Sequence, residues 1–209
     1  MSEPLTTGAQ PRRLVVAVSG ASGSVLGLRL LQLLRQAPGW EVHLVLSAAA
    51  VLTAKLELDV ERKAFEALAD HVHDNKAIGA TLASGSFHTD GMVVIPCSMN
   101  TLAAIANGMS GNLIARAADV TLKERRKLVL VTREAPLNLI HLRNMTLATE
   151  AGAVIVPPVP SFYLGMTSLD EVVTQIAGRV LDQFAIQVSD IKRWDGAQGS
   201  LVAGSRVDD

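Results

Sequence analysis

The chain has 209 residues, of which 49% are hydrophobic and 19% are charged, and its formal net charge is −1 at pH 7. This length and composition indicate one globular domain with a full core, exclude a disordered chain, and give no sign of nucleic acid as a partner. A single cysteine excludes an internal disulfide, and no apolar run reaches the ~18 residues of a membrane span, so we expect a cytoplasmic protein.

The polar segment 1–12 has no apolar core of the signal-peptide type, and we expect it to be a disordered lead-in. Residues 13–195 are expected to form one α/β domain, because apolar runs and helical patterns alternate along them without a linker. Residues 196–209 are expected to form a polar tail.

The first predicted unit is a strand, a turn and a helix. The apolar run Leu14–Val18 is typical of a strand buried on both faces, and leucines return at helical spacing from Leu28 to Leu34. The turn between them is rich in glycine and serine. Such a turn lets the backbone approach a phosphate, and the first N–H groups of the helix can bind it. The same pattern also fits a plain tight connection, so alone it decides nothing.

The next strand is expected at residues 41–47, and Ser47 at its end is a candidate N-cap for a helix over residues 48–56. After a polar helical region, His71 and His73 alternate in a short strand-like segment. They resemble a zinc pair, but the sequence has no third ligand close by. We therefore interpret them as edge or surface histidines.

A further buried strand, residues 92–97, ends in a turn rich in small polar side chains. Cys97 at this turn has two interpretations. At a helix N-terminus a thiol can be a nucleophile with a lowered pKa, but the chain offers no evident partner base. We favour a small buried residue at a strand end.

The remaining elements alternate in the same way, at residues 112–124, 127–132, 137–151, 153–156 and 169–184. This predicts a doubly wound α/β fold with a mostly parallel sheet. In such sheets ligands bind beyond the carboxyl ends of the strands. The residues expected at those ends are Gly20 to Ser22, Ser47, Ser98 to Thr101, Arg133, Glu134 and Tyr163. Hydroxyls converging with a cation predict a phosphorylated ligand or a nucleotide.

Five motifs stand in order along the chain: Ser19–Gly23, Pro96–Ser98, Arg116–Glu124, Arg133–Pro136 and Pro160–Tyr163. Together they resemble the UbiX-type flavin prenyltransferase family, over nearly the whole chain. The resemblance implies a flavodoxin-like or Rossmann-like fold and a homo-oligomer, typically a dodecamer. It implies transfer of a dimethylallyl group from dimethylallyl phosphate to reduced FMN, without a metal. The prenylated FMN would serve a UbiD-type decarboxylase.

Carried over by position, the resemblance also implies roles for single residues. Those that would hold FMN are Gly20, Ala21, Ser22, Ser47, Ser98, Met99, Asn100, Thr101 and Arg133. Those that would hold dimethylallyl phosphate are Lys123, Arg133, Tyr163 and Arg179. The catalytic set would be Ser22, Glu57, Lys123 and Glu134.

Arg116 and Trp194 match family positions with less defined roles. The chain departs from the family at Ala48, where a lysine is frequent, and at the variable pair Met99–Asn100. These departures affect details of FMN contact rather than groups needed for the chemistry.

The implied chemistry agrees with the residues. Ionising an allylic phosphate needs fixed donors around the leaving dianion, and cations with a tyrosine hydroxyl suit it. Reduced flavin is the nucleophile, so no protein nucleophile is needed. Glu134 or the departed phosphate can then accept the proton that ring closure releases.

Two other functions stay open at this point. An FMN-dependent decarboxylase of the phosphopantothenoylcysteine type would need a catalytic histidine near the flavin. His141 lies inside a predicted helix, and we interpret it as structural. A non-catalytic FMN-binding protein would leave Lys123, Glu134, Tyr163 and Arg179 without a role. The choice between a monophosphate and a diphosphate donor also stays open.

Overall fold

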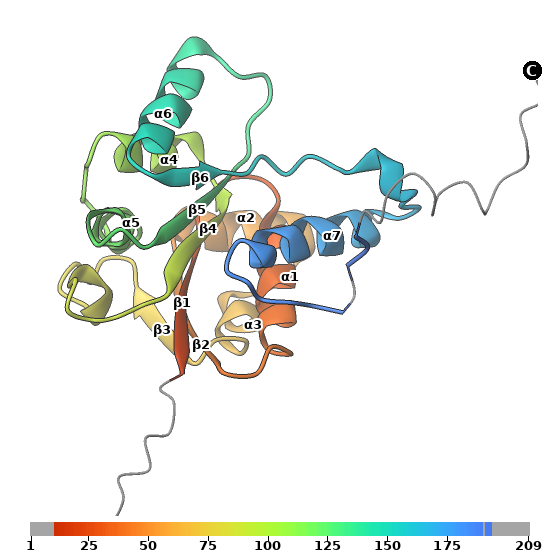
Figure 1. Cartoon of the computed structure of the whole chain (residues 1–209), viewed down its shortest axis with the longest axis horizontal. Coiled ribbons are helices and arrows are strands. Elements are labelled where there is room, and N and C mark those ends of the chain that lie inside the picture. The colour runs from red at the N-terminus through yellow and green to blue at the C-terminus, as the bar shows by residue number, and fades with distance from the viewer. Residues whose placement is uncertain (1–10, 190, 194–209) are drawn as a thin grey trace, which may run out of the picture.

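The computed structural model describes residues 11–189 and 191–193. Its strands are β1 Arg12–Val18, β2 Trp40–Leu46, β3 His71–Asp74, β4 Gly91–Cys97, β5 Lys127–Thr132 and β6 Ala153–Ile155. They form one six-stranded sheet in the order β3-β2-β1-β4-β5-β6, and every recorded strand pairing is parallel (Figure 1). This confirms the expected doubly wound α/β fold.

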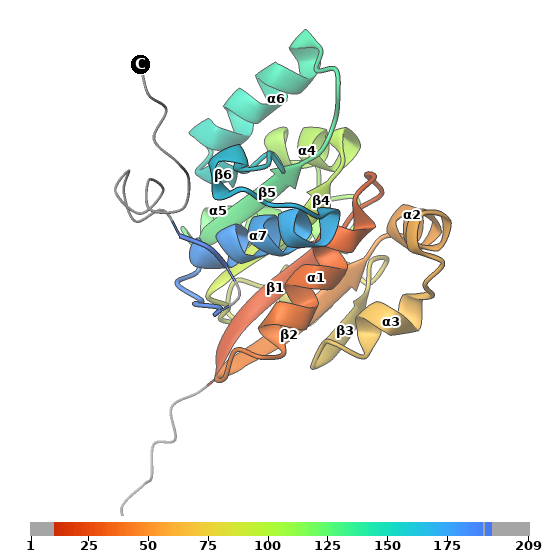
Figure 2. The same ribbon diagram turned by 90° about the vertical axis from the view of Figure 1, so that its right-hand side faces the viewer.

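Helices cover both faces of the sheet. They are α1 Ser24–Leu34, α2 Ala48–Leu58, α3 Arg62–Glu66, α4 Met99–Ala106, α5 Leu113–Lys123, α6 Leu139–Glu150 and α7 Leu169–Asp182. Helices α1 and α7 lie on one face, as Figure 2 shows. Among the described residues, none of these helices has the length and apolar character that crossing a bilayer requires.

Alternate residues of β1 enter two separate cores. Val16 packs with Leu30 of α1 and Leu181 of α7, whereas Val15 belongs to the core formed with α4 and α5. Because successive side chains of a strand point to opposite faces, a central strand covered on both sides must be apolar throughout. This is why a continuous apolar run marked β1 in the sequence.

The chain reverses its winding between β1 and β4, which lie side by side at the centre of the sheet. Ser19 joins the ends of these two strands: its Oγ donates to the carbonyl of Pro96 at 2.9 Å and accepts from the N–H of Ser98 at 2.8 Å. The two turns that follow the strands are thereby held together. A doubly wound sheet binds ligands at this reversal point.

Two glycines allow close approach near this point. A Cβ at Gly20 would lie 2.4 Å from the Cβ of Ala49, and a Cβ at Gly27 would lie 2.6 Å from the carbonyl oxygen of Ile95. Both distances are far below normal contact. The turn after β1 can therefore pack against α2, and α1 against β4, only with glycine at these positions.

Element boundaries differ slightly from those expected. Arg12, expected in the lead-in, is the first residue of β1, where its Nε lies 3.2 Å from Asp90. Helix α6 begins at Leu139 rather than at residue 137, because the side chain of Asn138 accepts from the N–H of His141 and caps the helix. Most of the lead-in, Trp194 and the tail 196–209 lie outside the described residues.

Candidate active site

A cavity of about 260 Å³ opens at the carboxyl ends of the central strands. Ser22, Gly23 and Arg133 form its polar side, and the proline loop before α7 and the first turns of α7 form an apolar wall. A cavity of this kind suits a ligand with a flat apolar body and polar or anionic groups at its edge. The structure therefore brings Ser22 and Arg133 together, as expected from the sequence.

The N-terminus of α1 is capped by a carboxylate of the same chain. Both oxygens of Glu57, near the end of α2, accept from the N–H of Gly23 at 3.0 Å, and one accepts from the N–H of Ser24 at 2.9 Å. Of the two interpretations left open for this turn, the contacts with Glu57 fit a structural connection at Gly23 and Ser24. Glu57 thus fixes the turn that carries Ser22.

The pKa of Glu57 reflects these bonds. Burial acts to raise the pKa, but hydrogen bonds from Ser22, Ser24 and Gly23 outweigh it and hold the pKa below its ordinary value. The positive end of the α1 dipole favours the same ionised form. Glu57 is therefore a carboxylate at neutral pH and orients the Ser22 hydroxyl.

We predict that Glu57→Gln lowers stability by about 1 kcal/mol at neutral pH, as loss of a helix cap does. A group whose pKa is lowered by folding stabilises the protein above its unfolded pKa, and this stabilisation disappears as the pH falls through the folded pKa. The difference between wild type and variant should therefore shrink in acid. Urea unfolding at several pH values measures it. A difference that is the same at every pH would show that the charge of Glu57 does not matter.

Two other helices, α2 and α4, begin directly after the carboxyl end of a strand. Ser98 caps α4: its Oγ accepts from the N–H of Thr101 at 3.3 Å and donates to the Thr101 hydroxyl at 3.1 Å. Ser47 caps α2 by accepting from the N–H of Ala50 at 3.0 Å, as predicted. The free N–H groups in a first helical turn bind phosphate well. The α4 turn is the one of the two that lies beside the reversal point of the sheet.

Thr132 is a candidate that sequence reasoning missed. It is the last residue of β5, its side chain is buried, and its hydroxyl has no hydrogen-bond partner among the described residues. Buried hydroxyls are normally paired, so an unpaired one beside Arg133 is suited to a polar edge of a bound ligand. The sequence signal for Thr132 is its position at the end of a buried strand, directly before the predicted site residues Arg133 and Glu134.

Arg133 and Glu134 follow β5 directly and are both exposed. The N–H of Arg133 donates to the carbonyl of Cys97 at 3.1 Å, which keeps the start of this loop against the end of β4. Glu134 Oε1 accepts from the N–H of Ala135 at 3.0 Å. Arg133 lines the cavity, and Glu134 is the next residue of the same exposed loop.

Tyr163 and Arg179 lie in a second, basic cavity of about 290 Å³, whose other lining residues are Gln175, Lys192 and Arg193. A smaller cavity between them, bounded by the proline loop and α7, shares Ile176 with the first cavity and Arg179 with the second. The three cavities therefore adjoin one another along α7. Ser22 and Arg133 line the cavity at one end, and cations line the cavity at the other.

Arg179 and Arg193 share one carboxylate. Asp182 contacts Arg179 at 2.6 Å and Arg193 at 2.7 and 3.0 Å. With Lys192, the three cations outnumber this carboxylate, so the cavity is suited to a dianion. Lys192 and Arg193 were not identified from the sequence. The buried Gln175 holds them there by pairing with both backbone groups of Lys192, at 2.7 and 3.0 Å.

Lys123 and Arg116 do not join these residues within one chain. Lys123 is the last residue of α5, and its Nζ pairs with Glu124. It lies close to the start of β5, whereas Arg133 follows the end of that strand, about 20 Å away at the usual rise per residue. Arg116 bonds the carbonyl of Ala83 at 3.2 Å and pairs with Asp119 at 2.6 Å.

The flavoprotein family matches residues 2–181 of the chain. The flavin prenyltransferase UbiX of Escherichia coli K12 is 54% identical over 188 residues, which cover 89% of this chain and all of that protein. The crystal structure of AnUbiX in complex with FMN and dimethylallyl pyrophosphate has a TM-score of 0.87 and 52% identity, covering 89% of this chain and 98% of that one. The chain belongs to the UbiX-type flavin prenyltransferase family.

A third relative is described as a dodecameric FMN-dependent UbiX-like decarboxylase from Escherichia coli O157:H7. It has a TM-score of 0.86 and 49% identity, covering 88% of this chain and all of that one. These matches confirm the resemblance found from the sequence motifs. They also confirm the flavodoxin-like fold.

Cys97 and His141, the residues an alternative chemistry would need, are both in structural positions. Burial raises the pKa of the Cys97 thiol to about 12, which excludes a thiolate nucleophile and agrees with the favoured interpretation. The ring of His141 accepts from the N–H of Asn138 in the capping box of α6.

Proposed function

We propose that the chain is a flavin prenyltransferase that joins the dimethylallyl group of dimethylallyl phosphate to reduced FMN, making prenylated FMN for a UbiD-type decarboxylase. The observation that carries the proposal is the row of adjoining cavities along α7, from the cavity of Ser22 and Arg133 to the cavity with the cations around Arg179. A flavin and an allylic phosphate need such adjoining sites. The names of the relatives and the ligands of the AnUbiX complex support it.

The residues at the strand ends fit FMN. The α4 turn of Ser98, Met99, Asn100 and Thr101 offers N–H groups to the phosphate, and Arg133 offers a cation. Further proposed contacts to FMN come from the turn of Gly20 and Ala21, from Ser47, and from the hydroxyl of Thr132, which has no partner among the described residues. Bound FMN, once reduced, supplies the nucleophilic atom that receives the prenyl group.

The cations act on the leaving phosphate. Arg179 and the Tyr163 hydroxyl, with Arg133 in the first cavity, stabilise negative charge as the carbon–oxygen bond of the allylic phosphate breaks. Because Tyr163 follows the proline loop and Arg179 is carried by α7, these two donors need little reorganisation during the step. Glu134 then accepts the proton released on ring closure, and Ser22, oriented by Glu57, assists.

Lys123 joins this site only if it comes from a neighbouring copy of the chain, since β5 separates it from Arg133 within one copy. Large apolar side chains are exposed on α6, among them Leu139, Ile140 and Leu142, and are suited to subunit contacts. We therefore propose a homo-oligomer, a dodecamer like the Escherichia coli O157:H7 relative. The single, reduced cysteine agrees with the expected cytoplasmic location.

A direct experiment tests the function. The purified protein, incubated without oxygen with reduced FMN and dimethylallyl phosphate, should yield a flavin heavier by one dimethylallyl group in mass spectrometry. A parallel incubation with dimethylallyl diphosphate decides which donor is used. Unchanged flavin mass with both donors would contradict the proposal, and binding of FMN without turnover would favour a storage protein.

A further inference from the structure

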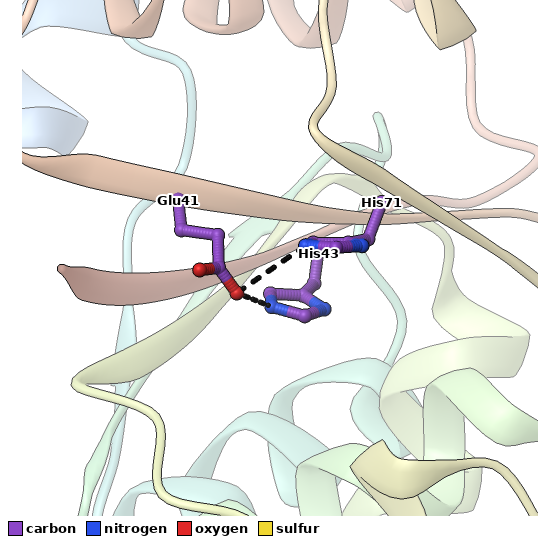
Figure 3. A group of neighbouring side chains, drawn as sticks. All are labelled: Glu41, His43 and His71. Carbon is purple, nitrogen blue, oxygen red and sulfur yellow. Dashed lines mark hydrogen bonds and ion pairs between the residues drawn. The ribbon is translucent and has the colours of Figure 1, made fainter. Parts of the chain in front are cut away.

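A cluster of ionisable side chains lies on one face of the sheet at its β2–β3 edge. Glu41 and His43 are alternate residues of β2, and His71 is the β3 residue paired in register with His43, so all three point to the same side (Figure 3). The cluster lies in the first half of β2 and at the start of β3. The flavin-site residues follow the opposite ends of the strands, so the two sites are separate.

The expectation that His71 has no third ligand nearby is therefore wrong. Glu41 and His43 are far from His71 along the chain, and only the pairing of β2 with β3 brings them together. His73 joins as well, since it is next but one to His71 on the same face. A sequence pattern that looks only at local spacing cannot reveal such a group.

The distances suit a tetrahedral metal ion. Glu41 Oε1 lies 2.8 Å from His43 Nε2 and 3.4 Å from His71 Nε2, and the three ligand atoms all lie within 4.8 Å of one another. Around a zinc ion with bonds of about 2.0–2.1 Å, neighbouring ligand atoms are about 3.3 Å apart. Two imidazoles and one carboxylate are also ligands that zinc accepts.

A second layer of contacts orients the buried ligand. His43 Nδ1 lies 3.0 Å from His73 Nε2. A metal-binding histidine commonly donates its other N–H to a neighbour, which fixes the tautomer. With its proton on Nδ1 and donated to His73, His43 presents the lone pair of Nε2 to an ion.

The site is open on one side. The side chain of His71 is 53% exposed, which gives an ion an entry path and leaves room for water as a fourth ligand.

Two features of the cluster weaken the binding of an ion. The rings of His43 and His71 are stacked with centroids 4.6 Å apart, so the exposed His71 ring must turn for both lone pairs to converge. Arg13, with its Nε 3.0 Å from Glu41 Oε1, also repels a cation.

We propose that Glu41, His43 and His71 bind a zinc ion, with His73 as the hydrogen-bond partner of His43 and water as the fourth ligand. The ion joins the edge strand β3 to β2 and so stabilises the edge of the sheet. It takes no part in prenyl transfer. Because of Arg13 and the required turn of His71, we expect micromolar affinity rather than the tighter binding of buried structural zinc sites.

The test uses the full chain after removal of metals with a chelator. Calorimetric titration with zinc chloride near neutral pH should show one ion per chain with micromolar affinity, and cobalt(II) should give the visible absorption of a four- or five-coordinate ion. Zinc about a hundredfold above its Kd should raise Tm by about 5–10 °C. His71→Ala, at an exposed edge position, should abolish binding, and His73→Ala should weaken it about 10–100-fold.

His88→Ala is the matched control, because His88 is an exposed histidine outside the cluster. It should bind zinc as wild type does. The proposal is overturned if wild type binds no zinc, or if His71→Ala and His88→Ala bind it equally. Loss of binding in His88→Ala alone would also overturn it, since the ion would then sit at another surface histidine.

Discussion

Glu134→Gln should keep FMN and dimethylallyl phosphate bound but slow prenyl transfer by about 10²–10⁴-fold, the usual cost of losing an acid–base group. Glutamine preserves the size of the side chain, and its Oε1 can still accept from the N–H of Ala135, which Glu134 does at 3.0 Å. It cannot accept a proton as a carboxylate can. The loop after β5 should therefore keep its shape while the chemical step slows.

Single-turnover absorbance at saturating donor measures this step apart from binding. Glu150→Gln is the control, since Glu150 is an exposed carboxylate at the end of α6, away from the strand ends. It should turn over at the wild-type rate. If Glu134→Gln does the same, Glu134 has a structural role and the departed phosphate is the base.

The sequence was sufficient for the fold, because the fold depends on local patterns. The strands β1, β4 and β5 are buried on both faces, and each stands in the sequence as an unbroken apolar run. Caps such as Ser47 and Ser98 bond N–H groups only three residues away, so they too could be predicted.

The site could be predicted only in part, because several of its contacts join distant segments. Glu57 bonds the turn before α1 across more than thirty residues, and no local pattern in the sequence shows this contact. Gln175 likewise brings Lys192 into the basic cavity by contacts between α7 and the segment after it. Such contacts depend on how elements pack, which periodicity does not report.

The roles of single residues came from the family motifs rather than from periodicity. Motifs name residues but not the copy of the chain that supplies them. Lys123 matches the family position, yet the structure places it by the start of β5 and Arg133 beyond its end. Only an assembly can reconcile the two positions, and a single sequence holds no direct information about an assembly.

Arg179→Ala should lower kcat/KM for dimethylallyl phosphate by about 10–100-fold, the typical loss for a charge-assisted hydrogen bond. The protein should still fold. Arg179 pairs with the largely buried Asp182, but Arg193 holds both oxygens of that carboxylate at 2.7 and 3.0 Å, so the substitution leaves no unpaired buried charge. The loss is then one of phosphate binding and not of stability.

Steady-state kinetics separates two ways in which Arg179 can act. If its contact is equally strong before and during ionisation, KM rises and kcat stays. If the contact strengthens as charge develops on the leaving phosphate, kcat falls as well. Tyr163→Phe should show the same pattern to a smaller extent, since it removes one neutral donor.

Arg35→Ala is the matched control, because Arg35 also pairs with a carboxylate, Asp70, but outside the cavities. Its kinetics should equal those of wild type. If Arg179→Ala is as active as Arg35→Ala, Arg179 does not hold the phosphate. Lys192 and Arg193 would then be the cations that bind it, because they line the same cavity and Asp182 neutralises only one charge there.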